Sequence, residues 1–145
     1  MNVNREEIYG ALFNALDALR AAGDLTTTSR RLKHIDQTDL SEFPCGHQVQ
    51  QDENAKAQSR LPTIWTLNAE WWLYVQDSSD APLSTQLNNL LDKVTTILDP
   101  ETPLTLNTLG GRVYNAQVNG TVEVIEGVLG DRALAIVPIR IAKAD

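Results

Sequence analysis

Apolar residues recur at helical spacing in two stretches of the chain. In residues 6–22 they fall every three or four positions with polar residues between them, and Gly23 stands where such a helix would end. A second apolar stripe runs through residues 83–98, after the turn-forming sequence DSSDAP, in which Asp80 is a candidate N-cap. Both stretches predict amphipathic helices that lie on a sheet.

Residues 61–75, LPTIWTLNAEWWLYV, alternate between apolar and polar positions. One parity is almost wholly apolar, which is typical of a long strand with one buried face. The other parity is polar in the middle but carries Trp72 and Tyr74 towards its end. These two aromatic side chains either pack under a loop or form a subunit interface, where large aromatics are enriched.

Residues 26–35 begin with β-branched residues and continue with Arg30, Arg31 and Lys33. This composition predicts a strand at an edge of the sheet, because charge of this density suits an edge. The three basic residues are also candidate contacts for an acidic partner. The alternative is that they form a solvated face, as most charge runs do.

Residues 112–141 contain two turn signals between three β-rich runs, which predicts a β-meander. The Asn-Gly pair at 119–120 and the Gly-Asp pair at 130–131 each suit a two-residue hairpin turn. Counting outward from the second turn places Leu129 opposite Arg132. The face assigned to the core then holds Val122, Val124, Val128, Ala133, Ala135, Val137, Ile139 and Ile141, interrupted by Glu126.

The other face of this meander carries three apolar residues that a solvated face should not hold together. They are Ile125, Leu134 and Ile136, and the same count places Ile125 opposite Ile136. Either a second layer of the same chain covers them or a neighbouring subunit does. With Trp72 and Tyr74 they are the candidate subunit interface.

Residues 37–60 show no sustained period and are mostly polar. They predict a long loop between the first two strands, and loops of this length are typically functional or are ordered by a partner. We therefore expect a mobile or partner-ordered segment, with Phe43, His47 and Gln50 as further candidate partner contacts.

The predicted element order is helix, strand, long loop, strand, helix and meander. Two amphipathic helices need one apolar sheet face, which the meander supplies. We therefore expect a single α+β domain over residues 1–145, with two layers: a mainly antiparallel or mixed sheet covered on one face by both helices.

Charge and cysteine content narrow the function classes. A net charge of −7 over 145 residues argues against binding nucleic acid by neutralising phosphates, although DNA could still pass close by. The single cysteine excludes an internal disulfide framework and indicates a reducing, intracellular origin. No apolar run has the length of a signal peptide core or a membrane span, so no membrane association is expected.

No group of residues forms a recognisable catalytic, cofactor or metal motif. Cys45 and His47 lie close in sequence, but a structural zinc site needs about four ligands and a loop fixes no catalytic geometry. Glu126 on the predicted core face is the strongest support for a small enzyme or ligand-binding domain, because a buried carboxylate can be functionally tuned. No second acid, base or nucleophile converges on it, so we expect no enzyme activity and no cofactor.

Three strings resemble the tail terminator, or tail completion, proteins of tailed bacteriophages and prophages. They are WTLNAEWWLYV, LNNLLDKV and TLGGRVYNAQVNGTVEVIEGVLGDRALAIVPIRI, within residues 63–141. The resemblance implies a virion assembly protein made in the host bacterial cytoplasm. Proteins of this family form a six-fold ring on the last ring of the tail-tube protein, stop its polymerisation and present their other surface to the neck.

The partners follow from the same resemblance. It implies a homo-oligomer, expected to be a hexamer, that contacts the tail-tube protein and a neck or connector protein in the virion. DNA would pass through the ring without sequence-specific binding. The alternative within the same class is another neck adaptor or tail structural subunit.

Overall fold

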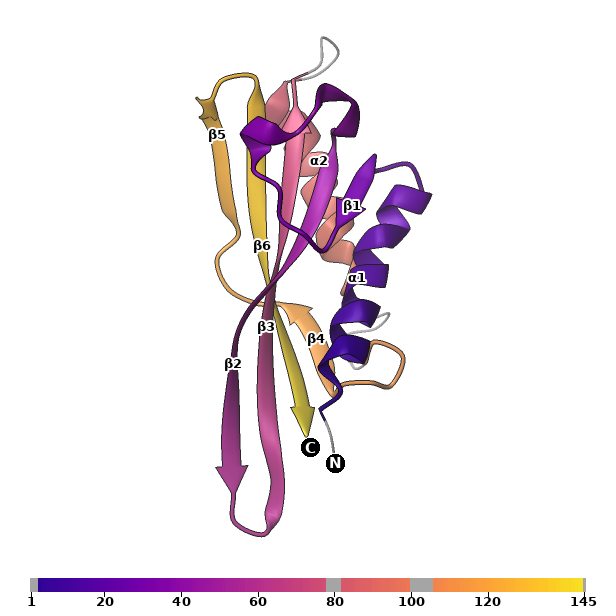
Figure 1. The fold of residues 1–145 in the computed structure, drawn as a ribbon, viewed down its shortest axis with the longest axis vertical. Coiled ribbons are helices and arrows are strands. Elements are labelled where there is room, and N and C mark those ends of the chain that lie inside the picture. Colours follow the sequence, from indigo (N-terminus) through magenta and orange to yellow (C-terminus); the bar gives the residue numbers. More distant parts are fainter. Residues whose placement is uncertain (1–2, 78–81, 100–105, 145) are drawn as a thin grey trace.

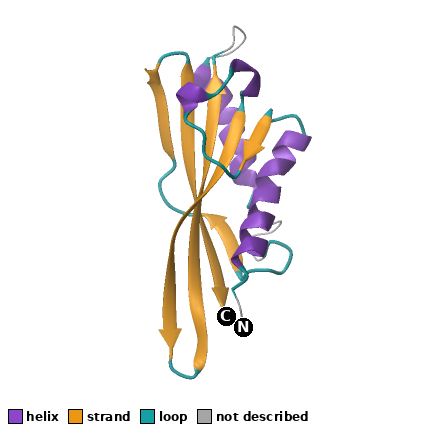
Figure 2. Ribbon diagram, in the orientation of Figure 1, coloured by secondary structure: helices purple, strands orange, loops and turns teal. Residues whose placement is uncertain are grey.

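The computed structural model describes residues 3–77, 82–99 and 106–144, without the side chains of residues 127–129. Within these ranges, two α-helices lie on the same side of a mixed six-stranded sheet (Figures 1 and 2). The predicted α+β class with two helices on one sheet face is therefore confirmed.

Two helices, two short 3₁₀ turns and six strands make up the described chain. In order they are α1 (Arg5–Ala21), β1 (Thr27–Ser29), η1 (Ile35–Gln37), η2 (Leu40–Glu42), β2 (Cys45–Gln58), β3 (Leu61–Gln76), α2 (Leu83–Ile97), β4 (Asn115–Val118), β5 (Glu123–Leu129) and β6 (Arg132–Ala144). The strand order is β1-β2-β3-β6-β4, and β5 also pairs with β6. β1 runs parallel to β2, whereas the other pairs are antiparallel.

Both helices form where the apolar stripes predicted them. α1 ends in a Schellman motif: Gly23 has a φ of 86°, its N–H donates to Arg20 O (3.1 Å), and Asp24 N–H donates to Leu19 O (2.8 Å). Glycine suits this position because the left-handed conformation costs it little. Asp80, the predicted cap of α2, lies outside the described residues.

The main core lies between the helices and the alternating positions of β3 and β6. The predicted inward residues are buried in β6 and in β3 from Leu67 onward: Leu67, Ala69, Trp71, Leu73, Val75, Ala133, Ala135, Val137, Ile139 and Ile141. Nearer the start of β3, Thr63 and Trp65 are only partly buried and Leu61 is exposed. Each fully buried Leu, Ile or Val contributes about 1.5–3 kcal/mol relative to exposure. Burial of this face is therefore the main source of stability.

The prediction of a loop over residues 37–60 is wrong. Cys45–Gln58 forms β2, which pairs along β3 through a two-residue turn in which Arg60 has a φ of 63°. The outer part of this hairpin extends beyond the other strands (Figure 1) and most of its β2 side chains are exposed, so no apolar alternation marks it. The backbone edge of β3 supplies its pairing instead.

The strand predicted over residues 26–35 is shorter than expected. Only Thr27–Ser29 pairs with β2, at the edge of the sheet as predicted. Beyond Ser29 the chain leaves the edge, and Ile35 enters a second hydrophobic cluster on the opposite face of the sheet. The irregular segment between the first two strands is therefore residues 30–44.

Only the second hairpin of the predicted meander forms. β4 pairs with β6 rather than with β5, so β4 and β5 follow one another along the same side of β6. The break lies beside Pro138, which has no N–H to donate to a neighbouring strand, and Asn119 N–H donates to Pro138 O (3.1 Å). β6, at 13 residues, is long enough to pair with both.

The register of the second hairpin is partly as predicted. Leu129 lies opposite Arg132, but an irregularity then shifts the pairing by two residues, so Ile125 faces Leu134 and Glu123 faces Ile136. A shift of two preserves the side to which each residue points. Ile125, Leu134 and Ile136 therefore share the outer face, as predicted.

Candidate assembly surfaces

Residues 30–43, here called the strap, cross the outer face of the sheet. Figure 1 shows this segment in front of the strands and α2 behind them. Three strap carbonyls accept hydrogen bonds from side chains of three successive strands. The pairs are Arg31 O with His47 Nδ1 of β2 (3.1 Å), Lys33 O with Tyr74 Oη of β3 (2.9 Å) and Ile35 O with Arg132 Nη1 of β6 (2.5 Å).

The spacing of these bonds explains how a segment with little regular structure is fixed. The accepting carbonyls belong to alternate residues, so an extended chain meets one strand after another as it crosses the sheet. Each of these bonds is partly buried and contributes about 0.5–1.5 kcal/mol. The three donors therefore determine where the strap can lie.

A second hydrophobic cluster lies under the strap. Its buried members are Ile35, Cys45, Tyr74 and Leu134, and the partly buried members are Phe43, Trp72, Ile125 and Ile136. A second layer of the same chain thus covers the apolar patch on the outer face of β5 and β6. Tyr74 and Leu134 belong to the subunit interior, whereas Ile125, Ile136 and Trp72 retain accessible surface at its rim.

Two of the three basic candidate contacts are neutralised within the chain. Arg30 forms an ion pair with Glu6 of α1 (2.5 Å) and also donates to Gln50 Oε1 (3.2 Å). Lys33 pairs with Glu42 (3.1 Å), and this hydrogen bond lowers the pKa of the Glu42 carboxyl. Arg30 and Gln50 therefore belong to one cluster of side-chain contacts with Glu6, and Lys33 belongs to a separate pair with Glu42.

Arg31 differs from its two neighbours. Its side chain is exposed and forms no hydrogen bond or ion pair with any residue that the structure describes. Its backbone is fixed, because Arg31 N–H donates to Ser29 Oγ (2.9 Å) and its carbonyl accepts from His47. A cavity of about 410 Å³ lies beside it, with Leu32 and His34 also in its lining.

The remaining loop candidates lie in or near the second cluster. Phe43 packs under Arg132, whose guanidinium carbon is 4.8 Å from the ring centre. His47 is 6% exposed, and burial lowers its pKa. Since a carbonyl can only accept, His47 Nδ1 carries the proton on the neutral ring, and the buried Nε2 has no partner among the described residues.

The side chains that could act as a nucleophile, an acid or a metal ligand are not arranged for such a role. Burial raises the pKa of Cys45 to about 12, which keeps its thiol protonated and weakly nucleophilic. Glu126 is exposed at the margin of the sheet, so it is not the buried carboxylate that an enzyme hypothesis required. In the described part of the chain, no three His, Cys, Asp or Glu side chains are grouped to hold a metal ion.

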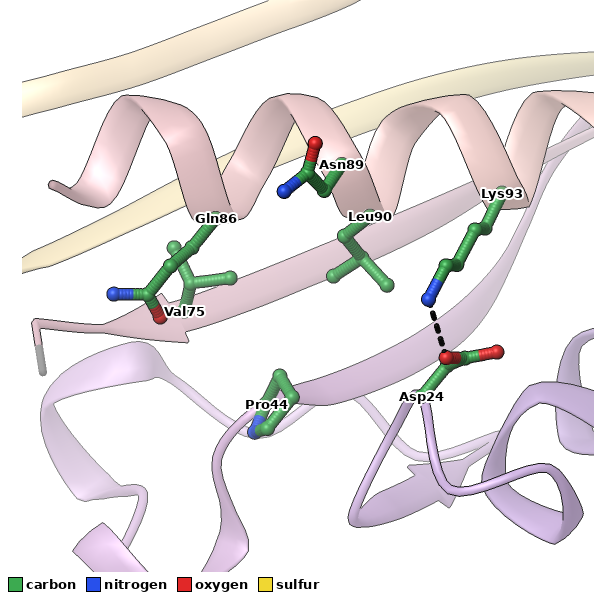
Figure 3. Close-up of a pocket in the computed structure, with 7 residues that line it drawn as sticks. All are labelled: Asp24, Pro44, Val75, Gln86, Asn89, Leu90 and Lys93. Atoms are coloured by element: carbon green, nitrogen blue, oxygen red, sulfur yellow. Dashed lines mark hydrogen bonds and ion pairs between the residues drawn. The ribbon is translucent and has the colours of Figure 1, made fainter. Parts of the chain in front are cut away.

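The cavity between α2 and the start of β2 is smaller than the cavity beside Arg31. Its volume is about 190 Å³, with Val75, Leu90 and Pro44 around it and the Lys93–Asp24 ion pair (2.6 Å) at one end (Figure 3). Pockets for small organic ligands are usually about 300–1,000 Å³.

No helix in the described ranges is long and apolar enough to cross a membrane.

Comparison with known proteins gives a likeness of fold. No protein-family model matches the chain, and no curated protein sequence matches it. Among solved structures, one chain in the virion of a native gene transfer agent particle is similar, with a TM-score of 0.59. The similarity covers 94% of this chain and 93% of that chain at 11% sequence identity. At this identity it establishes a shared fold.

The exposed edge formed by Glu123, Val124 and Glu126 is not predicted by the sequence. Val124 was assigned to the core, but it is 51% exposed between Glu123 and Glu126, which are also exposed. The predicted pairing with β4 would have enclosed β5 between two strands. Because β4 pairs elsewhere, β5 is an edge strand, and only its two charged residues, Glu123 and Glu126, signal this position.

Proposed function

We propose that this protein is a virion assembly protein of a phage-like particle, and that it forms a ring that caps the tail tube. The observation that carries the proposal is the fold shared with a chain of the gene transfer agent virion over almost the full length of both chains. The more specific role comes from the resemblance of the strings within residues 63–141 to tail terminator proteins.

The shape of the subunit suits a ring. Its sheet has free edges on opposite sides, so one copy can contact the next in a repeated head-to-tail manner that closes when the rotation between copies permits. The partly exposed Ile125, Ile136 and Trp72 at the rim of the second cluster are candidates for this contact, and Tyr74 and Leu134 would support them from below.

The hairpin of β2 and β3 suits a different contact. It extends past the rest of the sheet (Figure 1) and exposes Leu61, which is 63% accessible. In a ring, six such hairpins could contact the tail-tube protein or a neck protein above or below. The net charge of −7 per chain would let DNA cross the ring without being retained.

Capping implies a mechanism based on geometry. One surface of the ring would bind the last ring of tube protein, and the opposite surface would lack the features on which another tube ring could add. Elongation would then stop at the cap. The free surface would meet the neck or connector of the filled head.

Electron microscopy of the purified protein, alone and with polymerising tube protein, tests this function. We expect closed six-fold rings, and tubes that stop growing when one ring is present per tube end. A protein that co-polymerises along the tube would be a tail subunit instead, and open filaments of the protein alone would refute capping.

A further inference from the structure

In the described part of the chain, the two lateral edges of the sheet expose unpaired charged side chains of opposite sign. At one edge, Arg31 follows β1 and has an exposed guanidinium with no partner in the described ranges. At the other edge, Glu123 and Glu126 of β5 are exposed, and neither carboxylate has a partner among the residues described. The strand order places β1 and β5 on opposite sides of the sheet (Figure 1).

Each charged edge also exposes a large apolar side chain. Leu32, next to Arg31, is 45% exposed, and Val124, next to Glu123, is 51% exposed. Leu32 also lines the 410 Å³ cavity beside β1, whose lining includes polar and apolar residues. Both edges therefore combine an apolar contact with charge, and the signs of the charges are complementary.

Both edges are held in place before any partner binds. The Arg31 backbone is bonded at its N–H and at its carbonyl, and Tyr74 fixes the strap two residues further on. β5 is paired with β6 at Glu123, Val124 and Ile125. Little backbone entropy is lost at these positions when the surfaces dock, which favours association.

We propose that the Arg31–Leu32 edge of one copy docks on the Glu123–Val124–Glu126 edge of the next copy. This inference rests on the proposed ring and specifies its contact: Ile125 and Ile136, the apolar candidates named above, lie beside the same acidic edge, because Ile136 is paired with Glu123. A second copy is the favoured occupant because it carries the complementary acidic edge itself. Nucleic acid is disfavoured, because binding a phosphate backbone requires several cations and this chain is strongly acidic.

The contact is heterologous, since it joins two different surfaces. Each copy that docks leaves one basic edge and one acidic edge free, so addition continues in the same sense until the first and last copies meet. A ring assembled in this way has no free edge of either kind. The same contact without closure would give filaments.

Cysteine cross-linking tests the contact directly. One preparation carries Leu32→Cys and the other Val124→Cys, and the two are mixed and treated with a short bis-maleimide. We expect a covalent dimer in the mixture only, and a ladder ending at the closed ring when both changes are in one chain. Leu32→Cys mixed with Leu61→Cys is the matched control, because Leu61 is similarly exposed but lies on the hairpin. Cys45, at 1% exposure, is too buried to react.

Charge reversal tests the electrostatic part. Arg31→Glu should weaken association about tenfold or more, as should Glu123→Arg with Glu126→Arg, whereas a mixture of the two variants should recover it. The same reversal at Arg140, which is exposed on the outer face of β6, should leave association within about twofold.

The outcomes separate this contact from the proposed function. Rings that form without the Leu32–Val124 cross-link overturn the contact and leave the capping role intact. Cross-linked open filaments support the contact and refute the cap. If the protein neither assembles nor cross-links at every concentration tested, the proposed contact and the capping role are both refuted.

Discussion

Replacing Tyr74 by phenylalanine isolates one of the three bonds that hold the strap. Tyr74 is 1% exposed and its ring packs in the second cluster, 5.1 Å from the ring of His47. Its hydroxyl donates to Lys33 O over 2.9 Å. The substitution removes this donor and keeps the aromatic ring, so the packing of the cluster should change little.

The size of the effect follows from what replaces the lost donor. A typical intramolecular hydrogen bond contributes about 0.5–1.5 kcal/mol net, and a carbonyl left buried without a partner costs about 1–3 kcal/mol. The strap lies at the surface and the bond is only partly buried, so water can reach the Lys33 carbonyl. We expect a loss of about 1 kcal/mol, which lowers Tm by about 2–4 °C in a domain of this size.

Urea unfolding followed by far-ultraviolet circular dichroism measures this loss. Tyr114→Phe is the matched control, because Tyr114 is 68% exposed and its hydroxyl has no hydrogen bond to any described residue. Hydrogen exchange gives a local measure: the amides of Gln37 and Thr38, which donate to His34 O and Ile35 O, should exchange faster only in the Tyr74 variant.

Two results would refute this account of the strap. An unchanged urea midpoint with unchanged exchange at Gln37 and Thr38 would mean that the Tyr74 hydroxyl does not hold the segment. An equal loss in the Tyr74 and Tyr114 variants would mean that the effect comes from tyrosine removal in general. A change in the urea m value would instead point to altered compactness of one of the two states.

Two further predictions concern buried groups. Gln48 is 2% exposed and joins Trp71 Nε1 (3.0 Å) to the Tyr9 carbonyl of α1 (2.9 Å), so Gln48→Leu should leave the indole donor unpaired and lower stability in urea by about 1–3 kcal/mol. Burial raises the pKa of Tyr9 and Tyr74 from 10.0, and of Cys45 from 9.0, each to about 12. The unfolded chain therefore loses these protons first, so stability should be complete below about pH 9 and fall as the pH rises towards 12, as urea midpoints across that range will show.

The main core could be predicted because its pattern is local and one-sided. In β3 and β6, alternate residues face the helices, and nearly all of those positions are apolar. The stripe along each helix repeats every three or four residues for the same reason. Where a single buried face decides the structure, the sequence carries the period of the element.

β2 could not be predicted, because its outer half has no buried face. Residues 50–57 are polar or small and nearly all exposed, and several of these residue types are uncommon in strands. The turn that joins β2 to β3 also lacks the usual signal, since Arg60 adopts the positive φ that normally selects glycine or asparagine. The remaining indication was indirect: a strand as long as residues 61–75 needs neighbours on both edges.

The position of the strap could not be predicted from the sequence, for a different reason. Its three anchoring bonds join residues that are 16, 41 and 97 positions apart. No local pattern records such pairs. The contrast between Arg31 and its neighbours was equally hidden, because it depends on Glu6 and Glu42 reaching Arg30 and Lys33. Three basic residues that look equivalent in the sequence differ in the folded chain.

Salt dependence can distinguish a charge-complementary contact from a purely apolar one. Each copy has a net charge of −7, so a ring brings together subunits that repel one another, and added salt screens that repulsion. If Leu32 and Val124 alone made the contact, association would strengthen as salt increased. If Arg31 pairs with Glu123 or Glu126, screening acts on the attraction as well. At physiological ionic strength the screening length is already about 8 Å, so most of the diffuse repulsion is gone. Further salt then weakens mainly the close pairs, and association should fall.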